Sequence, residues 1–129
     1  MATLTSPADL GAVLKREYDR DYNRETVTLE SGTDYPIGAV LGVITASGNY
    51  ALSPHASTVG IEGAETAAAV LLVATDATSA DTEAVVLVRG PAIVADTPLV
   101  VDASVDDATK LAAKHAQLVA LGIVPRHTA

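Results

Sequence analysis

The residues best suited to acid–base chemistry or metal binding are sparse in this sequence. Its 129 residues include three histidines, His55, His115 and His127, and no cysteine. A histidine serves as a metal ligand or general base when further ligands or a carboxylate stand at a suitable spacing. None of the three has such neighbours. His115 falls on the apolar face of a predicted helix, which favours a hydrogen-bonded core or interface histidine over a catalytic base.

Paired acidic residues are the second possible source of chemistry. They occur at positions 106–107, at Glu62 with Glu65, and around Asp76 and Asp81. The first pair is explained by the start of a helix, and the others lie in predicted turns, where Asp and Glu are ordinary. Two carboxylates beside a glycine supply too few ligands for a cation by themselves. Nucleophile-elbow, zinc-protease and nucleotide-loop motifs are absent, so we expect no catalytic residue, cofactor or metal.

The composition indicates one acidic domain. Hydrophobic residues make up 49% of the chain, which excludes wholesale disorder, and aromatic residues make up 3%, all tyrosine. The net charge of −8 arises in residues 25–129, which hold four basic and twelve acidic side chains, whereas residues 1–24 hold four of each. An acidic body argues against a nucleic-acid partner. We find no signal-peptide pattern, and the apolar run 67–74 is too short to span a membrane.

The first 24 residues differ in pattern from the rest. Residues 6–9 (SPAD) resemble a helix start, and Leu10, Val13, Leu14 and Tyr18 follow at spacings of three and four. So short an amphipathic helix is not stable alone in water. The segment therefore docks on its own domain, waits for a partner, or is a frayed terminus, and its residues alone do not separate these possibilities.

Short strands are predicted over most of the chain that follows. Period-two alternation, β-branched residues and intervening turn residues indicate strands at 26–30, 37–45, 50–52, 67–74, 83–89, 92–94 and 99–101. The run 67–74 is apolar on both faces, as in a buried strand. Gly38 and Gly42 mark bulges or points of close approach.

One helix is predicted near the C-terminus. Ser104 is its expected N-cap, with Asp107 three residues on, and Gly122 its expected C-terminal cap. Lys110 and Lys114 are expected to point away from its apolar face. That face contains Ala108, Leu111, Ala112, His115, Leu118 and Val119.

The predicted fold is therefore mainly β with a minor α part, in the α+β sense. We expect a compact small domain resembling a β-barrel or sandwich, with one C-terminal helix and an N-terminal arm. The arm comprises residues 1–24 and the domain residues 25–129.

Four segments, in order, carry a resemblance to a known family. Residues 38–50 (GAVLGVITASGNY) resemble a G-x-V-L-G-x-I-T-x-S-G-x-Y stretch of tailed-phage head decoration proteins, the family of the lambda capsid-stabilising protein. The further matches are GAE with AVL at 63–65 and 69–71, DAT with AVVLVRG at 76–78 and 84–90, and LVALGI at 118–123. Glu62-Gly63-Ala64 departs from the family's Asp-Gly-Ser, which puts a turn or contact there in doubt. The resemblance covers residues 25–126, and the arm matches least.

The resemblance implies a structural, non-enzymatic role. Proteins of this family bind the expanded head as trimers at three-fold and quasi-three-fold positions and stabilise it against packaged DNA. The implied partners are the major capsid (coat) protein and further copies of this chain, with no nucleic acid and no membrane. The implied location is the outer surface of the virion head, preceded by the host cytoplasm.

The resemblance also implies that the arm orders against the coat protein. Apolar and aromatic arm residues would then be anchors, and basic residues would meet an acidic coat surface. The predicted contact residues are Leu4, Leu10, Val13, Leu14, Arg16, Tyr18, Arg20 and Tyr22. Two other functions stay open: a small β-rich surface-binding module for carbohydrate or protein, and an enzyme, for which no convergent polar site is visible.

Overall fold

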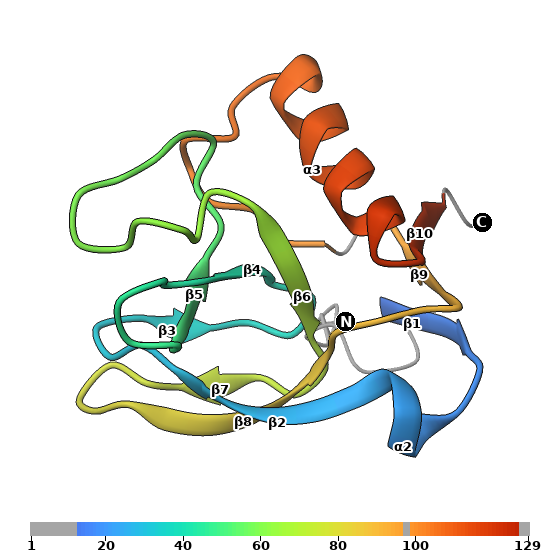
Figure 1. The fold of residues 1–129 in the computed structure, drawn as a ribbon, viewed down its shortest axis with the longest axis horizontal. Coiled ribbons are helices and arrows are strands. Elements are labelled where there is room, and N and C mark those ends of the chain that lie inside the picture. The colour runs from blue at the N-terminus through green and yellow to red at the C-terminus, as the bar shows by residue number, and fades with distance from the viewer. Residues whose placement is uncertain (1–12, 97–98, 127–129) are drawn as a thin grey trace, which may run out of the picture.

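A computed structural model describes residues 13–96 and 99–126 of the chain. The prediction of a mainly β domain with a C-terminal helix is confirmed (Figure 1). Its helices are α2 (Arg20–Asn23) and α3 (Ala108–Ala120). Its strands are β1 (Leu14–Glu17), β2 (Arg24–Leu29), β3 (Asp34–Tyr35), β4 (Val40–Val43), β5 (Tyr50–Leu52), β6 (Ala67–Leu71), β7 (Thr75–Asp76), β8 (Thr82–Leu87), β9 (Ala92–Ala95) and β10 (Ile123–Arg126).

Five strands close into a small barrel in the order β2-β5-β4-β6-β8. β2 and β8 pair antiparallel along their whole length, and β4 lies antiparallel between β5 and β6. The ring closes where Leu29 of β2 pairs in parallel with Tyr50 of β5. Gly42 lies at a close approach, as predicted, since a Cβ there would stand 2.1 Å from the Ala64 carbonyl oxygen. Closure of the ring rests on the single register pair between β2 and β5.

The barrel interior is built from small aliphatic side chains and one tyrosine. Tyr35 is 2% exposed, and its hydroxyl donates to the Glu30 carbonyl oxygen at 2.9 Å. The other buried members of this cluster are Leu29, Ala39, Leu41, Ala69, Leu71, Ala77, Ala84, Val86 and Val88. The scarcity of aromatic residues in the sequence thus has its counterpart in an alanine-rich barrel core.

Burial of Tyr35 gives a testable dependence of stability on alkaline pH. Desolvation holds the pKa of the Tyr35 phenol above its usual value of 10.0. The unfolded chain loses this proton at the ordinary pKa while the folded chain retains it, so the contribution of Tyr35 to stability falls as pH rises through 10. We expect Tyr35→Phe to cost about 1 kcal/mol near neutral pH through the lost hydrogen bond.

The gap in unfolding free energy between the wild type and Tyr35→Phe should therefore shrink towards alkaline pH. Urea unfolding of both proteins from about pH 8 to pH 11 measures it. Tyr50, whose pKa burial also raises, is present in both proteins and cancels in the comparison. A gap that stays constant over this range would contradict the predicted role of Tyr35.

A second layer covers one side of the barrel, at the right of Figure 1. It consists of α3 and a three-stranded sheet in the order β1-β9-β10, with β1 antiparallel and β10 parallel to β9. Between this layer and the barrel lies the larger core cluster, to which β6 contributes Val70, α3 Leu118 and β10 Ile123. β6 sends Val70 into this cluster and Leu71 into the barrel. That position between two cores explains why its sequence is apolar on both faces.

The predicted helical pattern near the N-terminus is wrong from Leu14 onwards. Leu14–Glu17 is strand β1, which pairs with β9, and Val13 before it is fully buried in the core. Pairing with β9 and burial of Val13 outweigh a weak amphipathic pattern interrupted by Gly11. Residues 6–9 and Leu10, on which the predicted helix start rests, lie outside the described residues.

Two local predictions before α3 are also wrong. Residues 99–101 form no strand, and Val100 makes only an isolated bridge with Ala39. The N-cap of α3 is Asp107, whose carboxylate accepts from the Lys110 amide at 2.8 Å, and not Ser104. The Ser104 hydroxyl instead donates to Asp102 and accepts from the His55 amide. The end of α3 is as predicted, with Gly122 at a φ of +84°.

α3 buries a different face from the one that its apolar pattern predicts. Leu118 is fully buried as expected, but Leu111 is 36% and Val119 51% exposed. Lys114, expected to point away from the apolar face, is 1% exposed and lies against the barrel. Oxygen atoms of Ser53, Pro54, Glu65 and Gln117 surround the Lys114 ammonium. They explain why this face of α3 turns inward, because they satisfy a charge that would otherwise be costly to bury.

Candidate functional site

The acidic residues found in pairs in the sequence accept hydrogen bonds from backbone amides, Glu65 and Asp76 within local turns and Asp81 from a distant segment. The Glu65 carboxylate accepts from the Gly63 amide at 2.8 Å, and Asp76 accepts from the Thr78 amide at 3.0 Å. Asp81 accepts from the Ser31 amide at 2.9 Å. Among residues 13–96 and 99–126 there is no group of three His, Cys, Asp or Glu side chains that could hold a metal ion.

The histidines do not converge on a reactive site either. His55 is exposed in the loop after β5, and His127 lies outside the described residues. His115 is half-buried, and its Nε2 is buried with no hydrogen-bond partner, so the hydrogen bond predicted for it is not made at that atom. The surface feature that stands out is formed instead by the segment from β1 through α2, which exposes Tyr18 and Tyr22.

A buried asparagine fixes this segment to the domain. Asn23 is fully buried, and its amide nitrogen donates to the carbonyl oxygens of Arg89 at 2.8 Å and Pro91 at 3.2 Å. Its side-chain oxygen accepts from the Asp19 amide at 2.7 Å. The Tyr18 amide also donates to the Pro91 carbonyl oxygen, at 3.0 Å. Residues 18–23 are therefore held to the β8–β9 connection by part-buried hydrogen bonds.

An ion pair fixes the same segment from the other side. The Arg24 guanidinium, at the start of β2, donates to both carboxylate oxygens of Glu17, at 3.0 and 2.7 Å. The side chains are only 19% and 16% exposed, so this bidentate pair is better shielded from water than a surface salt bridge. It ties the end of β1 to the barrel.

Two exposed tyrosines stand on this fixed backbone. Tyr18 is 75% and Tyr22 54% exposed, and their rings make an edge-to-face contact with centroids 6.3 Å apart. The Arg89 guanidinium lies 5.3 Å from the centre of the Tyr22 ring and also donates to the Tyr22 carbonyl oxygen and to Glu25. Tyrosine and arginine are typical anchor residues of protein interfaces, and here neighbouring groups hold them in place.

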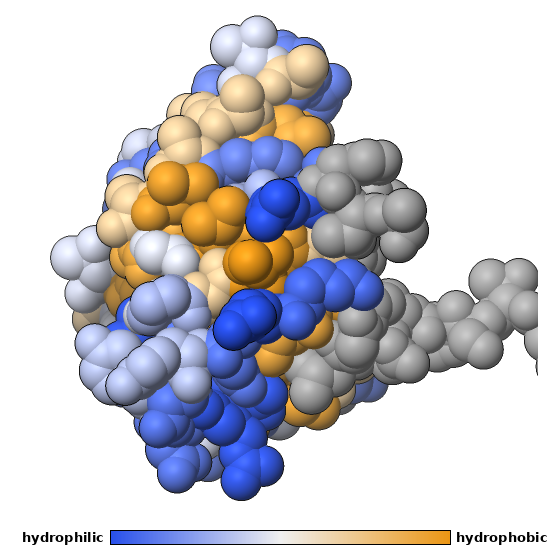
Figure 2. All heavy atoms as spheres, turned by 90° about the vertical axis from the view of Figure 1, so that its right-hand side faces the viewer, coloured by the Kyte–Doolittle hydropathy of each residue, from blue (hydrophilic) through white to orange (hydrophobic). Residues whose placement is uncertain are grey.

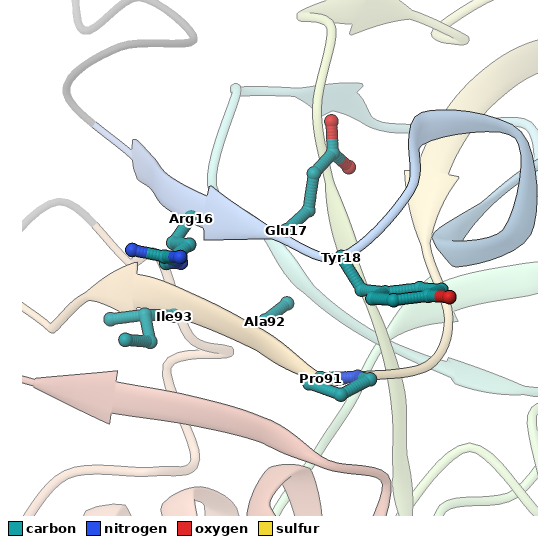
Figure 3. Close-up of a pocket in the computed structure, with 6 residues that line it drawn as sticks. All are labelled: Arg16, Glu17, Tyr18, Pro91, Ala92 and Ile93. Atoms are coloured by element: carbon teal, nitrogen blue, oxygen red, sulfur yellow. The ribbon is translucent and has the colours of Figure 1, made fainter.

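A groove runs beside Tyr18. It measures about 330 Å³ and is lined by Arg16, Glu17 and Tyr18 from the β1 side and by Pro91, Ala92 and Ile93 from the β9 side (Figure 3). Arg16 and Ile93 are register partners on β1 and β9, so their side chains share one face of the sheet. The groove can accept an apolar side chain between aromatic and aliphatic walls, with a guanidinium for an acidic neighbour.

Basic side chains gather at this end of an acidic chain. Six of its eight Lys and Arg residues lie in β1, α2, the start of β2, the β8–β9 connection and β10: Lys15, Arg16, Arg20, Arg24, Arg89 and Arg126. Arg20 is exposed and lines a second, more open groove between α2 and β2. Arg24 and Arg89 are paired with Glu17 and Glu25, and Asp19 and Asp21 share the segment, so this end of the domain is less acidic than the rest but carries no strong excess of positive charge.

The predicted contact residues fall into three groups. Arg16, Tyr18, Arg20 and Tyr22 are exposed and lie together on the β1–α2 surface. Val13 is fully buried and Leu14 half-buried against the core, so Val13 is not accessible to a partner in this structure. Leu4 and Leu10 lie outside the described residues.

Three members of this surface were not predicted. Arg89, Pro91 and Ile93 join it from the β8–β9 region, more than 60 residues away in sequence. The sequence predicts Arg89 at the end of one strand and Ile93 within the next one. No local pattern indicates that they face Tyr22 and Tyr18.

Comparison with known proteins places this chain in a family. A family model described as bacteriophage lambda head decoration protein D matches residues 3–123 of the 129-residue chain. The chain belongs to this family. The match extends into the arm, beyond the segments that carried the resemblance in the sequence. None of the curated proteins compared with the chain matches it.

Membership of the head decoration family assigns a coarse function. The family is one of structural phage proteins, so the role of the chain is decoration of the phage capsid and its place is on the capsid of the virion. Among the described helices, none combines the length and apolarity needed to cross a membrane.

Proposed function

We propose that this chain is a capsid cement protein. It binds the outer surface of the expanded head as trimers at three-fold and quasi-three-fold positions, and it stabilises the head against the pressure of packaged DNA. Its partners are the coat protein and two further copies of itself, with neither nucleic acid nor a membrane taking part. The chain waits in the host cytoplasm until head expansion forms its binding sites.

The observation that carries this proposal is the fixed, exposed Tyr18–Tyr22 pair beside the groove, on a domain of the head decoration family. The hydrogen bonds of Asn23 and the Glu17–Arg24 pair order this backbone before any partner arrives. A preordered surface loses little conformational entropy on binding. Tyr18 and Tyr22 act as anchors, while Arg16 and Arg20 meet acidic coat residues.

Binding of several copies is sufficient to stabilise the head without any chemical reaction. Three weak β1–α2 contacts on one trimer act together, since the second and third bind at high effective concentration once the first has formed. A trimer that touches neighbouring coat subunits then resists their separation. No step in this mechanism requires a reactive side chain, a cofactor or a metal.

Co-sedimentation with heads tests the proposed function. We expect the wild type to sediment with expanded heads and not with unexpanded heads. Tyr18→Ala removes an exposed anchor and should weaken binding by about tenfold or more. The control is Val59→Ala, at a residue that is 94% exposed in the loop between β5 and β6 and should bind like the wild type.

Absence of wild-type binding to either head form would overturn the cement role and leave a β-rich surface-binding module. Equal binding by Tyr18→Ala and the wild type would remove the β1–α2 surface from the contact. Circular dichroism on each variant confirms that the fold is retained, which is expected because Tyr18 lies outside the core.

A further inference from the structure

Arg89 contacts the end of α2 with both its side chain and its main chain. Its guanidinium donates one hydrogen bond to the Tyr22 carbonyl oxygen and another to the Glu25 carboxylate at 2.8 Å. The same guanidinium lies over the Tyr22 ring, 5.3 Å from its centre. The Arg89 carbonyl oxygen accepts from the Asn23 side chain at 2.8 Å. One residue of the β8–β9 connection therefore holds Tyr22 and the residue that follows it.

The guanidinium of Arg89 is already paired with an acidic group of its own chain. Glu25 is its partner, and the two side chains are 39% and 50% exposed. Because the Glu25 carboxylate offsets its charge, this guanidinium attracts an acidic residue of a second protein less than an unpaired one would. The contacts of Arg89 thus favour a role within the β1–α2 surface over a direct ion pair with a partner.

The Tyr22 ring depends on such contacts for its orientation. It is 54% exposed, and Figure 2 shows mainly hydrophilic surface towards the bottom of the view, where α2 lies. Hydrophobic packing therefore does little to fix the ring, and α2 has only four residues, too few to be stable alone. The ring is oriented instead by the Arg89 guanidinium and by its edge-to-face contact with Tyr18.

We propose that Arg89 is a positioning residue of the coat contact, which fixes the backbone and ring of Tyr22 without itself bridging to the coat protein. Because the Tyr22 ring contacts Tyr18, the effect of Arg89 extends to both anchors. A ring that is already held in one orientation loses less conformational entropy when a partner binds. This inference rests on the proposed function, since it explains how an anchor of that contact is held.

Lysine cannot replace arginine in this role. A planar guanidinium carries N–H groups at both ends, so it can donate to the Tyr22 carbonyl oxygen and to Glu25 while its face lies over the ring. A lysine ammonium is a point charge on a flexible chain and does not hold these three positions together. Arg89→Lys therefore keeps the positive charge but removes the positioning.

Hydrogen exchange of the free full-length chain tests whether Arg89 orders Tyr22. The amides of Asn23 and Arg24 donate the backbone hydrogen bonds that close α2. We expect them to exchange at least about threefold faster in Arg89→Met and in Arg89→Lys than in the wild type. Lys110→Met is the matched control, because it also removes one positive charge and one surface ion pair, and it should leave these amides unchanged.

A double-mutant cycle, measured by co-sedimentation with expanded heads, tests whether Arg89 acts through Tyr22. We expect Arg89→Met and Arg89→Lys each to bind heads about fivefold more weakly than the wild type and Lys110→Met do. In the Tyr22→Ala background, Arg89→Met should change binding by less than about twofold, because the ring that Arg89 positions is gone. Circular dichroism shows that each variant is folded, as we expect for exposed side chains.

Three results would overturn the proposal. The first is unchanged exchange of the Asn23 and Arg24 amides in Arg89→Met, and the second is binding of Arg89→Met to heads equal to that of the wild type. The third is an Arg89→Lys variant that binds like the wild type, or an undiminished effect of Arg89→Met in the Tyr22→Ala background, because Arg89 would then contact the coat protein directly. Failure of the wild type to bind heads would overturn the proposed function instead, while faster exchange in the free chain would still show that Arg89 orders Tyr22.

Discussion

Replacement of Lys114 by methionine is expected to lower the free energy of unfolding by about 3 kcal/mol. The Lys114 ammonium donates to the Ser53 hydroxyl oxygen at 2.8 Å and to the carbonyl oxygens of Pro54 and Glu65, both at 2.5 Å. The three short contacts engage the three N–H groups of the ammonium, and Gln117 Oε1 lies further away at 3.5 Å. Methionine fills much of the same volume but leaves the two buried backbone carbonyls without a donor.

The network around Lys114 reaches two loops and the start of β6. Gln117, one turn later on α3, accepts from the Ala67 amide at 2.7 Å, so the helix is fixed to the barrel through two consecutive polar contacts. Loss of the Lys114 contacts should therefore loosen the loop at Ser53 and Pro54 as well as the helix. Hydrogen exchange of the α3 amides, faster in Lys114→Met than in the wild type, would report this loosening.

Lys110→Met is the matched control for this prediction. Lys110 lies on the same helix, but its ammonium pairs with the exposed carboxylate of Asp106, and such surface pairs contribute little to stability, so Lys110→Met should unfold close to the wild type. Urea unfolding followed by circular dichroism measures both variants. A loss below about 1 kcal/mol in Lys114→Met would show that the buried network contributes little net stability.

Lys114 also illustrates where sequence-based prediction of this fold reaches its limit. Strands with alternating or continuous apolar residues, such as those around Val27, Val70 and Val86, were predictable because each pattern records one or two buried faces. The orientation of α3 depends on acceptors from Ser53, Pro54 and Glu65, which are 49 to 61 residues away. Helical periodicity carries no information about them, so the apolar face was assigned to the interior.

The candidate site shows the same division between local and distant signals. Tyr18, Tyr22, Arg16 and Arg20 are exposed, which is compatible with the contact role that the family resemblance implied for them. The residues that hold them in place were not predictable, because Asn23 and Arg89 make their hydrogen bonds with residues 66 to 68 positions away in the sequence. Whether this surface contacts the coat protein stays a prediction until heads are tested.

Removal of residues 1–24 is expected to prevent stable folding, whereas removal of residues 1–12 is not. The longer deletion takes away Val13, β1 and Asn23, and with them a fully buried aliphatic side chain, the β1–β9 pairing and the buried hydrogen bonds to Arg89 and Pro91. Burial of a valine contributes about 2 kcal/mol, and a buried amide network contributes a similar amount. Domains of this size have only about 5–15 kcal/mol in total.

The shorter deletion retains Val13, the β1–β9 pairing and the hydrogen bonds of Asn23, so we expect it to melt cooperatively. Thermal melting by circular dichroism distinguishes the two truncated proteins. Cooperative melting of the longer deletion near the wild-type temperature would show that β1 and α2 are dispensable for folding, contrary to their burial of Val13 and Asn23.

The point of truncation decides what a head-binding experiment can measure. Loss of binding after removal of residues 1–24 would have two causes at once, an unfolded domain and a missing contact. Removal of residues 1–12 deletes the predicted contacts Leu4 and Leu10 while Tyr18 and Tyr22 remain on a folded domain. Combined with Tyr18→Ala, it separates the contribution of the first residues from that of the β1–α2 surface. If each change alone weakens binding and their effects multiply, the two regions contact the head independently.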